Sequence, residues 1–123
     1  MKRALVIEDQ KLVRESIGEL LQVLGCEVRL IGDGQAALNE LLENKYDLIT
    51  VDLNMPSLDG ASVVEAIASQ DNPNRETPMI VISAYLSPAV TDDLKEFGIA
   101  HFLGKPFQAE ELLDPARQLL GIS

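Results

Sequence analysis

The pattern of hydrophobic residues alternates between two kinds of segment. Short apolar runs rich in branched residues are typical of buried parallel strands. Between and after them lie stretches in which apolar residues recur every three or four positions, as on one face of a helix. The alternation occurs five times and predicts an α/β fold with five helices and a parallel sheet of five strands. The predicted strands cover residues 4–7, 26–30, 48–51, 79–82 and 100–103.

The same runs predict the order of the strands in the sheet. The first, third and fourth runs are essentially apolar throughout, as strands covered on both faces must be, so they are expected at the centre. The second run alternates between apolar and polar residues, and the fifth is short and contains His101, so both are expected at the edges. With right-handed crossovers, these positions give a doubly wound sheet of order 2-1-3-4-5. Its switch point lies between strands one and three.

Local signals mark the ends of several helices. Ser87 followed by Pro88 predicts the start of the fourth helix, with the serine as N-cap. Gly25 is expected to end the first helix in the left-handed conformation. Pro115 lies within the last helical pattern, where it removes a backbone hydrogen bond. We expect a kink there, or a helix that restarts with Asp114 as cap.

Length and composition limit the class of protein. A chain of 123 residues with 46% hydrophobic and 24% charged residues is expected to form a single globular domain, 1–123. No apolar stretch approaches the roughly 20 residues that span a bilayer. The apolar run after the basic start is too short for a signal peptide. We therefore expect a cytoplasmic protein that is not bound to a membrane.

The net charge of -10 opposes direct binding of nucleic acid, which needs clustered basic residues. If DNA is involved, another chain or a missing domain must contact it. Cys26 is the only cysteine, so an intrachain disulfide and a thiolate metal cluster are both excluded.

Polar residues stand at or just after the ends of four predicted strands. They are Glu8 and Asp9, Asp52, Ser83 and Lys105. Because the carboxyl ends of parallel strands meet at one edge of a sheet, we expect these side chains to share one cleft. Three carboxylates offer oxygen ligands for a hard cation, and an amine stands opposite. Such a combination is suited to handling phosphate.

The sequence at these positions resembles the receiver domain of two-component response regulators over essentially all of the chain. The most specific segment is Asp52-Leu53-Asn54-Met55-Pro56-Ser57-Leu58-Asp59-Gly60, accompanied by Glu8-Asp9, Ser83-Ala84 and Lys105-Pro106. Glu8 replaces an aspartate and Ser83 a threonine that are commoner in the family, and both keep the required chemistry. The resemblance implies a flavodoxin-like sheet and a switch controlled by phosphorylation.

The chemistry of the cleft assigns a role to each residue. A carboxylate can accept a phosphoryl group when the negative charge on both partners is neutralised. Asp52 lies at the centre of the crevice and is the expected nucleophile. Glu8 and Asp9 would bind Mg²⁺. Asp52 and the backbone carbonyl of Asn54 would complete the protein ligands, as the resemblance implies.

The remaining residues are expected to read the phosphate. Lys105 would contact a phosphoryl oxygen, and the resemblance implies that the Lys105–Pro106 peptide bond is cis. The Ser83 hydroxyl would donate to another phosphoryl oxygen. The ring of Phe102 would change position together with Ser83, as in receivers that carry an aromatic residue there.

The expected function is a signalling switch rather than a metabolic enzyme. Asp52 would take a phosphoryl group from a sensor histidine kinase or a histidine phosphotransfer protein, and slow autodephosphorylation would remove it. A downstream effector protein or a missing output domain would respond. A homodimer through the fourth helix, the fifth strand and the fifth helix is a further expected assembly.

Two alternatives stay open from the sequence. A phosphatase of the haloacid dehalogenase type also forms an aspartyl-phosphate, but it carries a second acid where this chain has Asn54, and it normally needs a cap domain. A flavodoxin-like flavin carrier shares the topology. Its first loop should be rich in serine, threonine and glycine, whereas this chain has Glu8-Asp9-Gln10-Lys11.

Overall fold

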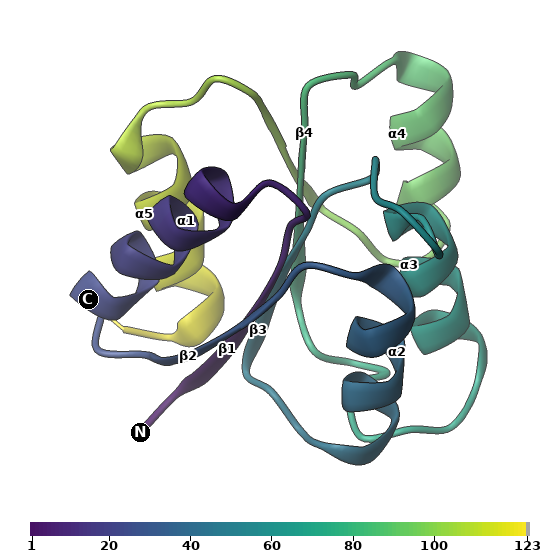
Figure 1. Cartoon of the computed structure of the whole chain (residues 1–123), viewed down its shortest axis with the longest axis horizontal. Coiled ribbons are helices and arrows are strands. Elements are labelled where there is room, and N and C mark those ends of the chain that lie inside the picture. Colours follow the sequence, from purple (N-terminus) through teal and green to yellow (C-terminus); the bar gives the residue numbers. More distant parts are fainter. Residues whose placement is uncertain (123) are drawn as a thin grey trace.

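The computed structural model describes residues 1–122, which form five parallel strands and five helices (Figure 1). The sheet has the order β2-β1-β3-β4-β5, so the predicted fold class and strand order are confirmed. The elements are β1 Arg3–Ile7, α1 Lys11–Val23, β2 Glu27–Ile31, α2 Gly34–Glu43, β3 Leu48–Val51, α3 Gly60–Ser69, β4 Met79–Ser83, α4 Pro88–Lys95, β5 His101–Gly104 and α5 Ala109–Leu120.

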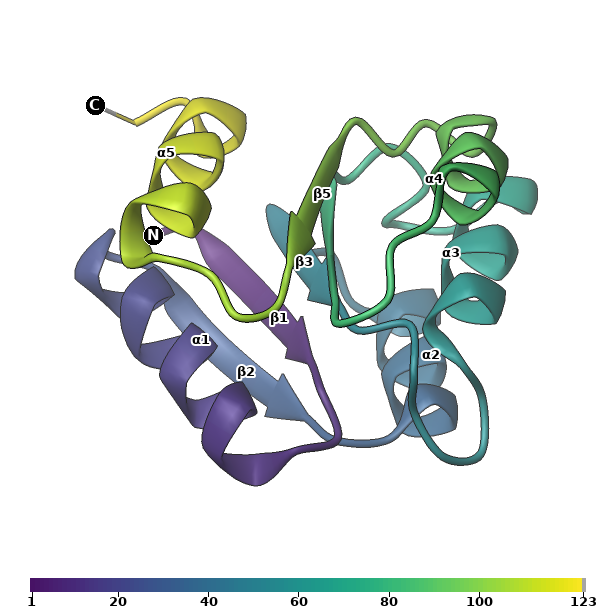
Figure 2. The ribbon, with the colours of Figure 1, turned by 90° about the horizontal axis from the view of Figure 1, so that it is seen from above.

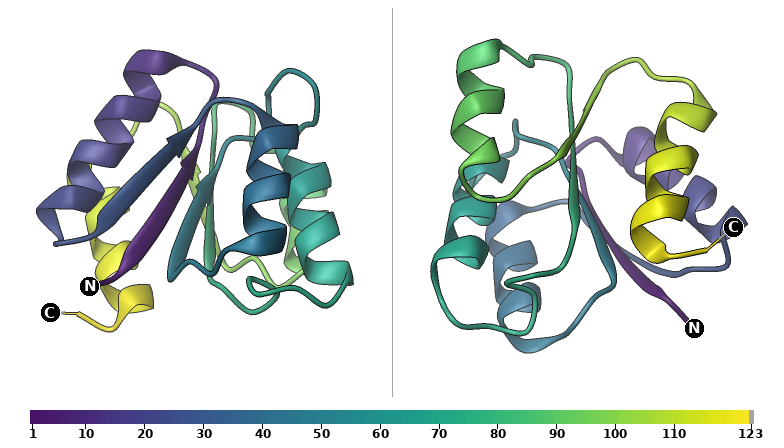
Figure 3. Two further views of the ribbon diagram at one scale, coloured as in Figure 1. Left: turned by 60° about the horizontal axis from the view of Figure 1, so that its bottom comes forward. Right: turned by 180° about the vertical axis from the view of Figure 1, so that it is seen from behind.

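Helices cover both faces of the sheet. Figure 2 shows α1 and α5 on one side and α2, α3 and α4 on the other. Successive side chains of a strand point to opposite faces, so each strand feeds two separate cores. In β1, Ala4 and Val6 pack with α1 and α5, whereas Leu5 and Ile7 pack with α2 and α3. Figure 3 shows that α5 returns antiparallel to the strands and ends near the start of β1.

Burial separates central strands from edge strands as predicted. Every residue of β3 and β4 is buried, and β1 is buried apart from its first residue. The edge strands are more exposed, and both are shifted by one residue from the predicted ranges. β2 begins at Glu27 instead of Cys26, and β5 begins at His101 instead of Ala100. Cys26 is nevertheless buried in the core under α1.

The predicted helix ends are largely confirmed. The Ser87 hydroxyl accepts a hydrogen bond from the Val90 amide at 3.2 Å, and Pro88 is the first residue of α4. Gly25 follows α1 with a φ of +88°.

The predicted restart of the last helix at Asp114 is wrong, because α5 runs unbroken through Pro115. Leu112 and Ala116 lie on either side of the proline and are both fully buried in one core. Burial of these side chains outweighs the lost backbone hydrogen bond. A kink within one helix stays a prediction.

A buried polar network ties the loops at the amino-terminal edge of the sheet. The Tyr46 hydroxyl donates to Glu40 at 2.5 Å, and the Arg3 guanidinium lies 4.6 Å from the centre of the tyrosine ring. The Asn74 side chain accepts from the Tyr46 amide at 2.8 Å and donates to two backbone carbonyls at 2.6 Å. The pKa of Tyr46 is raised to about 12, mainly because the side chain is buried and secondly because it donates a hydrogen bond to Glu40.

Tyr46→Phe should therefore lower the free energy of unfolding by about 1–2 kcal/mol at pH 8, because Glu40 loses its donor. A tyrosine whose pKa is raised on folding stabilises the native state fully below its unfolded pKa of 10.0. That stabilisation fades as pH rises toward the folded value of about 12. Urea unfolding between pH 8 and 12 should show the gap between parent and variant closing. A gap that stays constant across this range would contradict the assignment.

Candidate functional site

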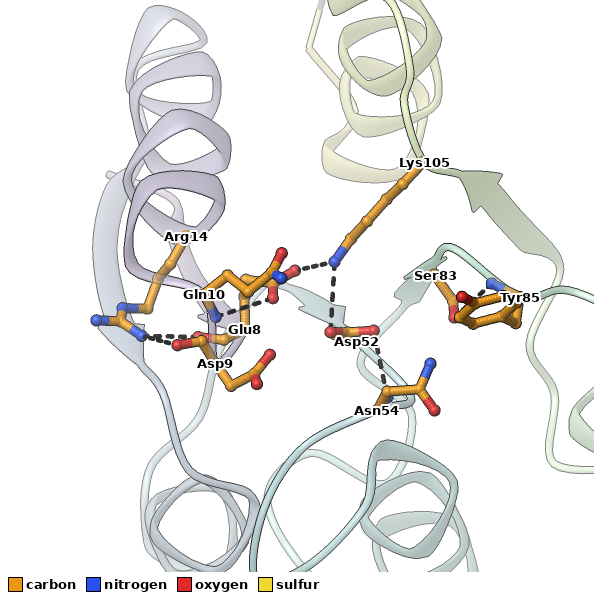
Figure 4. Close-up of polar contacts among 9 residues, drawn as sticks. All are labelled: Glu8, Asp9, Gln10, Arg14, Asp52, Asn54, Ser83, Tyr85 and Lys105. Atoms are coloured by element: carbon orange, nitrogen blue, oxygen red, sulfur yellow. Dashed lines mark hydrogen bonds and ion pairs between the residues drawn. The ribbon is translucent and has the colours of Figure 1, made fainter.

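The predicted polar residues converge at the carboxyl-terminal edge of the sheet (Figure 4). Glu8 and Asp9 follow β1, Asp52 follows β3, Ser83 ends β4 and Lys105 follows β5. Their backbones continue the strand ladder for one more residue. The amide of Asp52 donates to Ile7 O at 2.9 Å, and the amide of Lys105 donates to Ser83 O at 3.0 Å. The sheet therefore fixes where these side chains leave the backbone.

Three carboxylates form the floor of the site. Glu8, Asp9 and Asp52 each offer an oxygen, and these oxygens all lie within 4.8 Å of one another. Glu8 is 1% exposed and Asp52 is 4% exposed, whereas Asp9 is open to solvent. Like charges this close, two of them buried, repel strongly unless cations neutralise them.

Lys105 supplies part of that neutralisation. Its ammonium lies 2.5 Å from a Glu8 oxygen and 3.3 Å from an Asp52 oxygen. Burial raises the pKa of Glu8, and the hydrogen bond from Lys105 offsets part of that rise. Burial also opposes the charged form of Lys105, but the hydrogen bond to Glu8 and the charge of Asp52 outweigh it and raise the pKa of Lys105. One ammonium against three carboxylates leaves an excess of negative charge when all four groups are ionised.

The donor set fits Mg²⁺. Mg²⁺ is a hard cation that takes oxygen ligands, and it is usually held by one or two carboxylates while keeping several waters. Asp9 faces solvent and completes the cluster of three carboxylates. Asn54 lies next to the cluster. Its backbone amide donates at 3.3 Å to Asp52 Oδ1, whereas Lys105 contacts Asp52 Oδ2.

The loop that carries Asp52 and Asn54 is held by Gly60. A Cβ added at Gly60 would overlap the backbone oxygen of Asp52 and lie 2.9 Å from the Cα of Leu53. Only glycine permits this close approach. The amide of Gly60 donates to Leu53 O at 3.1 Å, which anchors the start of α3 beneath the site.

Ser83 and Phe102 lie on adjacent strands and on the same face of the sheet. Phe102 pairs with Val81, two residues before Ser83. Ser83 is fully buried, and its hydroxyl accepts from the Tyr85 amide at 3.3 Å. Phe102 is half-buried against the core beneath α2, α3 and α4. The Lys105–Pro106 peptide bond is cis.

Two residues of this region escaped the sequence analysis. The amide of Gln10 donates to the Glu8 carboxylate at 3.1 Å. Arg14, on α1, donates to the backbone carbonyls of Glu8 and Asp9 at 2.9 and 3.2 Å. For Arg14 the only hint in the sequence is that a basic residue lies about one helical turn after the acidic pair, which is a weak indication of contact. Gln10 acts through its backbone amide, so its side chain gives no hint.

Comparison with known proteins identifies the family. The sequence model of the response regulator receiver domain family matches residues 4–117 of this chain. The transcriptional regulatory protein PrrA of Mycobacterium tuberculosis is 40% identical over 120 residues, which cover 96% of this chain and 49% of PrrA. The chain therefore belongs to the response regulator receiver family.

Solved structures of response regulators and receiver domains have the same fold as this chain. The chemotaxis response regulator CheY4 of Vibrio cholerae has a TM-score of 0.87 at 31% identity, with 98% of this chain and 99% of that chain covered. The receiver domain of a sensor histidine kinase from Pseudomonas aeruginosa has a TM-score of 0.85 at 30% identity, with 98% of each chain covered. That structure has a magnesium ion coordinated in its active-site cleft.

The family defines the general class of function. Receiver domains of two-component systems are phosphorylation switches that work with histidine kinases and output effectors, and they generally bind Mg²⁺ at an acidic pocket. The chain spans about half the length of PrrA and of several other curated relatives that it matches. No helix among residues 1–122 combines the length and the apolar character needed to cross a bilayer.

Proposed function

We propose that Asp52 accepts a phosphoryl group from a phosphohistidine of a sensor histidine kinase or phosphotransfer protein, in a reaction that requires Mg²⁺. The observation that carries the proposal is the position of Asp52, which is 4% exposed and lies between the acidic pair and Lys105. In the transfer, an Asp52 oxygen forms a bond to phosphorus while the phosphorus–nitrogen bond of the donor breaks. The released imidazole takes up a proton.

The other side chains manage charge during this step. Mg²⁺ held by Glu8, Asp9, Asp52 and the Asn54 carbonyl would offset the negative charge of the phosphoryl oxygens. Lys105 keeps its ammonium beside Asp52 and can turn to a phosphoryl oxygen when the group arrives. Slow hydrolysis of the aspartyl-phosphate by water then returns the carboxylate and releases inorganic phosphate.

Phosphorylation is read out through Ser83 and Phe102. The Ser83 hydroxyl accepts from the Tyr85 amide, which leaves its own hydrogen to donate to a phosphoryl oxygen. Movement of Ser83 toward the phosphate makes room on the same face of the sheet for the Phe102 ring. The loop before α4 follows, and the face formed by α4, β5 and α5 changes. This face is where a homodimer or an effector would bind.

We assign the output to conformation, so the chain acts as a switch and not as a metabolic enzyme. Residues 1–123 form one receiver domain in this proposal, and an effector protein or an output domain outside these residues contacts any DNA. The family match gives no support to the haloacid dehalogenase and flavodoxin alternatives.

Incubation of the protein with acetyl phosphate and Mg²⁺ should add one phosphoryl group, because this donor, like phosphohistidine, carries an activated phosphoryl group; its P–O bond breaks and acetate leaves as the Asp52 oxygen bonds to phosphorus. Intact-mass spectrometry should detect the product, and chelation of the metal should prevent it. Asp52→Asn should remain unlabelled. Asp47→Asn is a matched control outside the cleft and should be labelled like the parent. Full labelling of Asp52→Asn on any residue would refute the assignment.

Binding of a beryllofluoride mimic at Asp52 should move Ser83 inward, turn Phe102 and shift the start of α4. Since a ligand shifts a two-state equilibrium only by its differential affinity, part of the unliganded population can already have the turned ring. Amide chemical shifts with and without the mimic measure the change. If the mimic binds while Ser83, Phe102 and α4 stay in place, another surface carries the signal.

A further inference from the structure

Arg14 lies beside the acidic pair and has no part in the chemistry proposed above. Its side chain leaves α1, and one guanidinium nitrogen donates to the carbonyl oxygens of Glu8 and Asp9 at 2.9 and 3.2 Å (Figure 4). Among residues 1–122 the guanidinium forms no ion pair with a carboxylate. Its charge therefore acts on the backbone of the two residues whose side chains would bind the metal.

The guanidinium packs closely against Gly32, which follows β2. A Cβ added at Gly32 would overlap the guanidinium nitrogen that makes both hydrogen bonds and lie 3.1 Å from Cζ. The neighbouring residue Ile31 accepts from the Glu8 amide at 3.1 Å. Three segments of chain thus meet at this arginine: the helix that carries it, the end of β1 and the end of β2.

We propose that Arg14 is a positioning residue that orients the acidic pair for Mg²⁺. A charged donor shared by two consecutive carbonyls fixes the peptide planes of Glu8 and Asp9, and hence the directions in which their carboxylates leave the backbone. Mutation of a group that hydrogen-bonds to metal-binding residues and orients them commonly lowers metal affinity by about tenfold or more. The inference rests on the proposed metal site.

Positioning and simple electrostatics predict opposite results. Removal of a positive charge near three carboxylates should strengthen the binding of a divalent cation, because one repulsive charge is lost. Loss of positioning should weaken it, because the ligands must be ordered when the ion binds. The sign of the change in Mg²⁺ affinity therefore separates the two roles.

The experiment measures the dissociation constant for Mg²⁺ by isothermal titration calorimetry on the parent and three variants. Arg14→Met removes the donor, and we expect affinity to fall by about tenfold. Gly32→Ala keeps the charge but displaces the guanidinium, so it should weaken binding in the same direction. Lys11→Met removes a positive charge from the exposed first turn of the same helix, and its affinity should be unchanged or slightly higher.

A double variant gives the sharpest control. A Cβ at Gly32 would overlap the guanidinium but lie 3.5 Å from the Glu8 carbonyl oxygen, an ordinary contact distance. Gly32→Ala should therefore cause no further loss of affinity in the Arg14→Met background. Circular dichroism without metal checks that each variant is folded. If the parent binds Mg²⁺ and both Arg14→Met and Gly32→Ala bind it as tightly or more tightly, the positioning role is overturned while the metal site stands. A parent that binds no Mg²⁺ overturns both.

Discussion

The ion pairs of Lys105 with Glu8 and Asp52 are the interactions on which the site depends. Two of the three carboxylates at the sheet edge are almost fully buried, and burial of unpaired charges is costly. The lysine is separated from its partners by 97 and 53 residues, so the contacts exist only when β1, β3 and β5 stand in the observed parallel order. The charge balance of the site is thus tied to the topology of the whole sheet.

The incomplete neutralisation of the carboxylates gives the site its proposed use. One lysine offsets part of the repulsion among the three carboxylates but leaves negative charge that attracts a divalent cation. A phosphoryl group on Asp52 would then bring further negative charge, which the metal and Lys105 would share. Ser83 and Phe102, on the neighbouring strands, would convert this redistribution of charge into a change of surface.

Much of the fold and of the candidate site was predictable from the sequence, because strong local signals carry both. The third strand was predicted without error, because a short apolar run between polar segments is typical of a buried strand. The edge strands were off by one residue. Cys26 is apolar and buried, but its amide donates to Leu21 O and closes the end of α1 instead of starting the strand. At Pro115, tertiary packing on both sides of the proline overrode the local preference.

Contacts made through the backbone were beyond sequence reasoning. Arg14 binds the carbonyl oxygens of Glu8 and Asp9, and every residue has a carbonyl, so no pattern of side chains predicts the partner. The same holds for Gly32, whose role depends on a side chain from another element. The side chains of the cleft could be predicted because they directly follow recognisable strands. Arg14 and Gly32, which hold them in place, could be identified only from the three-dimensional structure.

In the function proposed here, Lys105 and a divalent cation share the neutralisation of one carboxylate cluster. The most direct test is the free energy of unfolding of Lys105→Met and of the parent, measured with and without Mg²⁺. Without metal the variant should be less stable by about 2–3 kcal/mol, because buried carboxylates lose their counter-charge. Saturating Mg²⁺ should stabilise the variant more than the parent and close most of this gap. A gap of equal size in both conditions would contradict the claim.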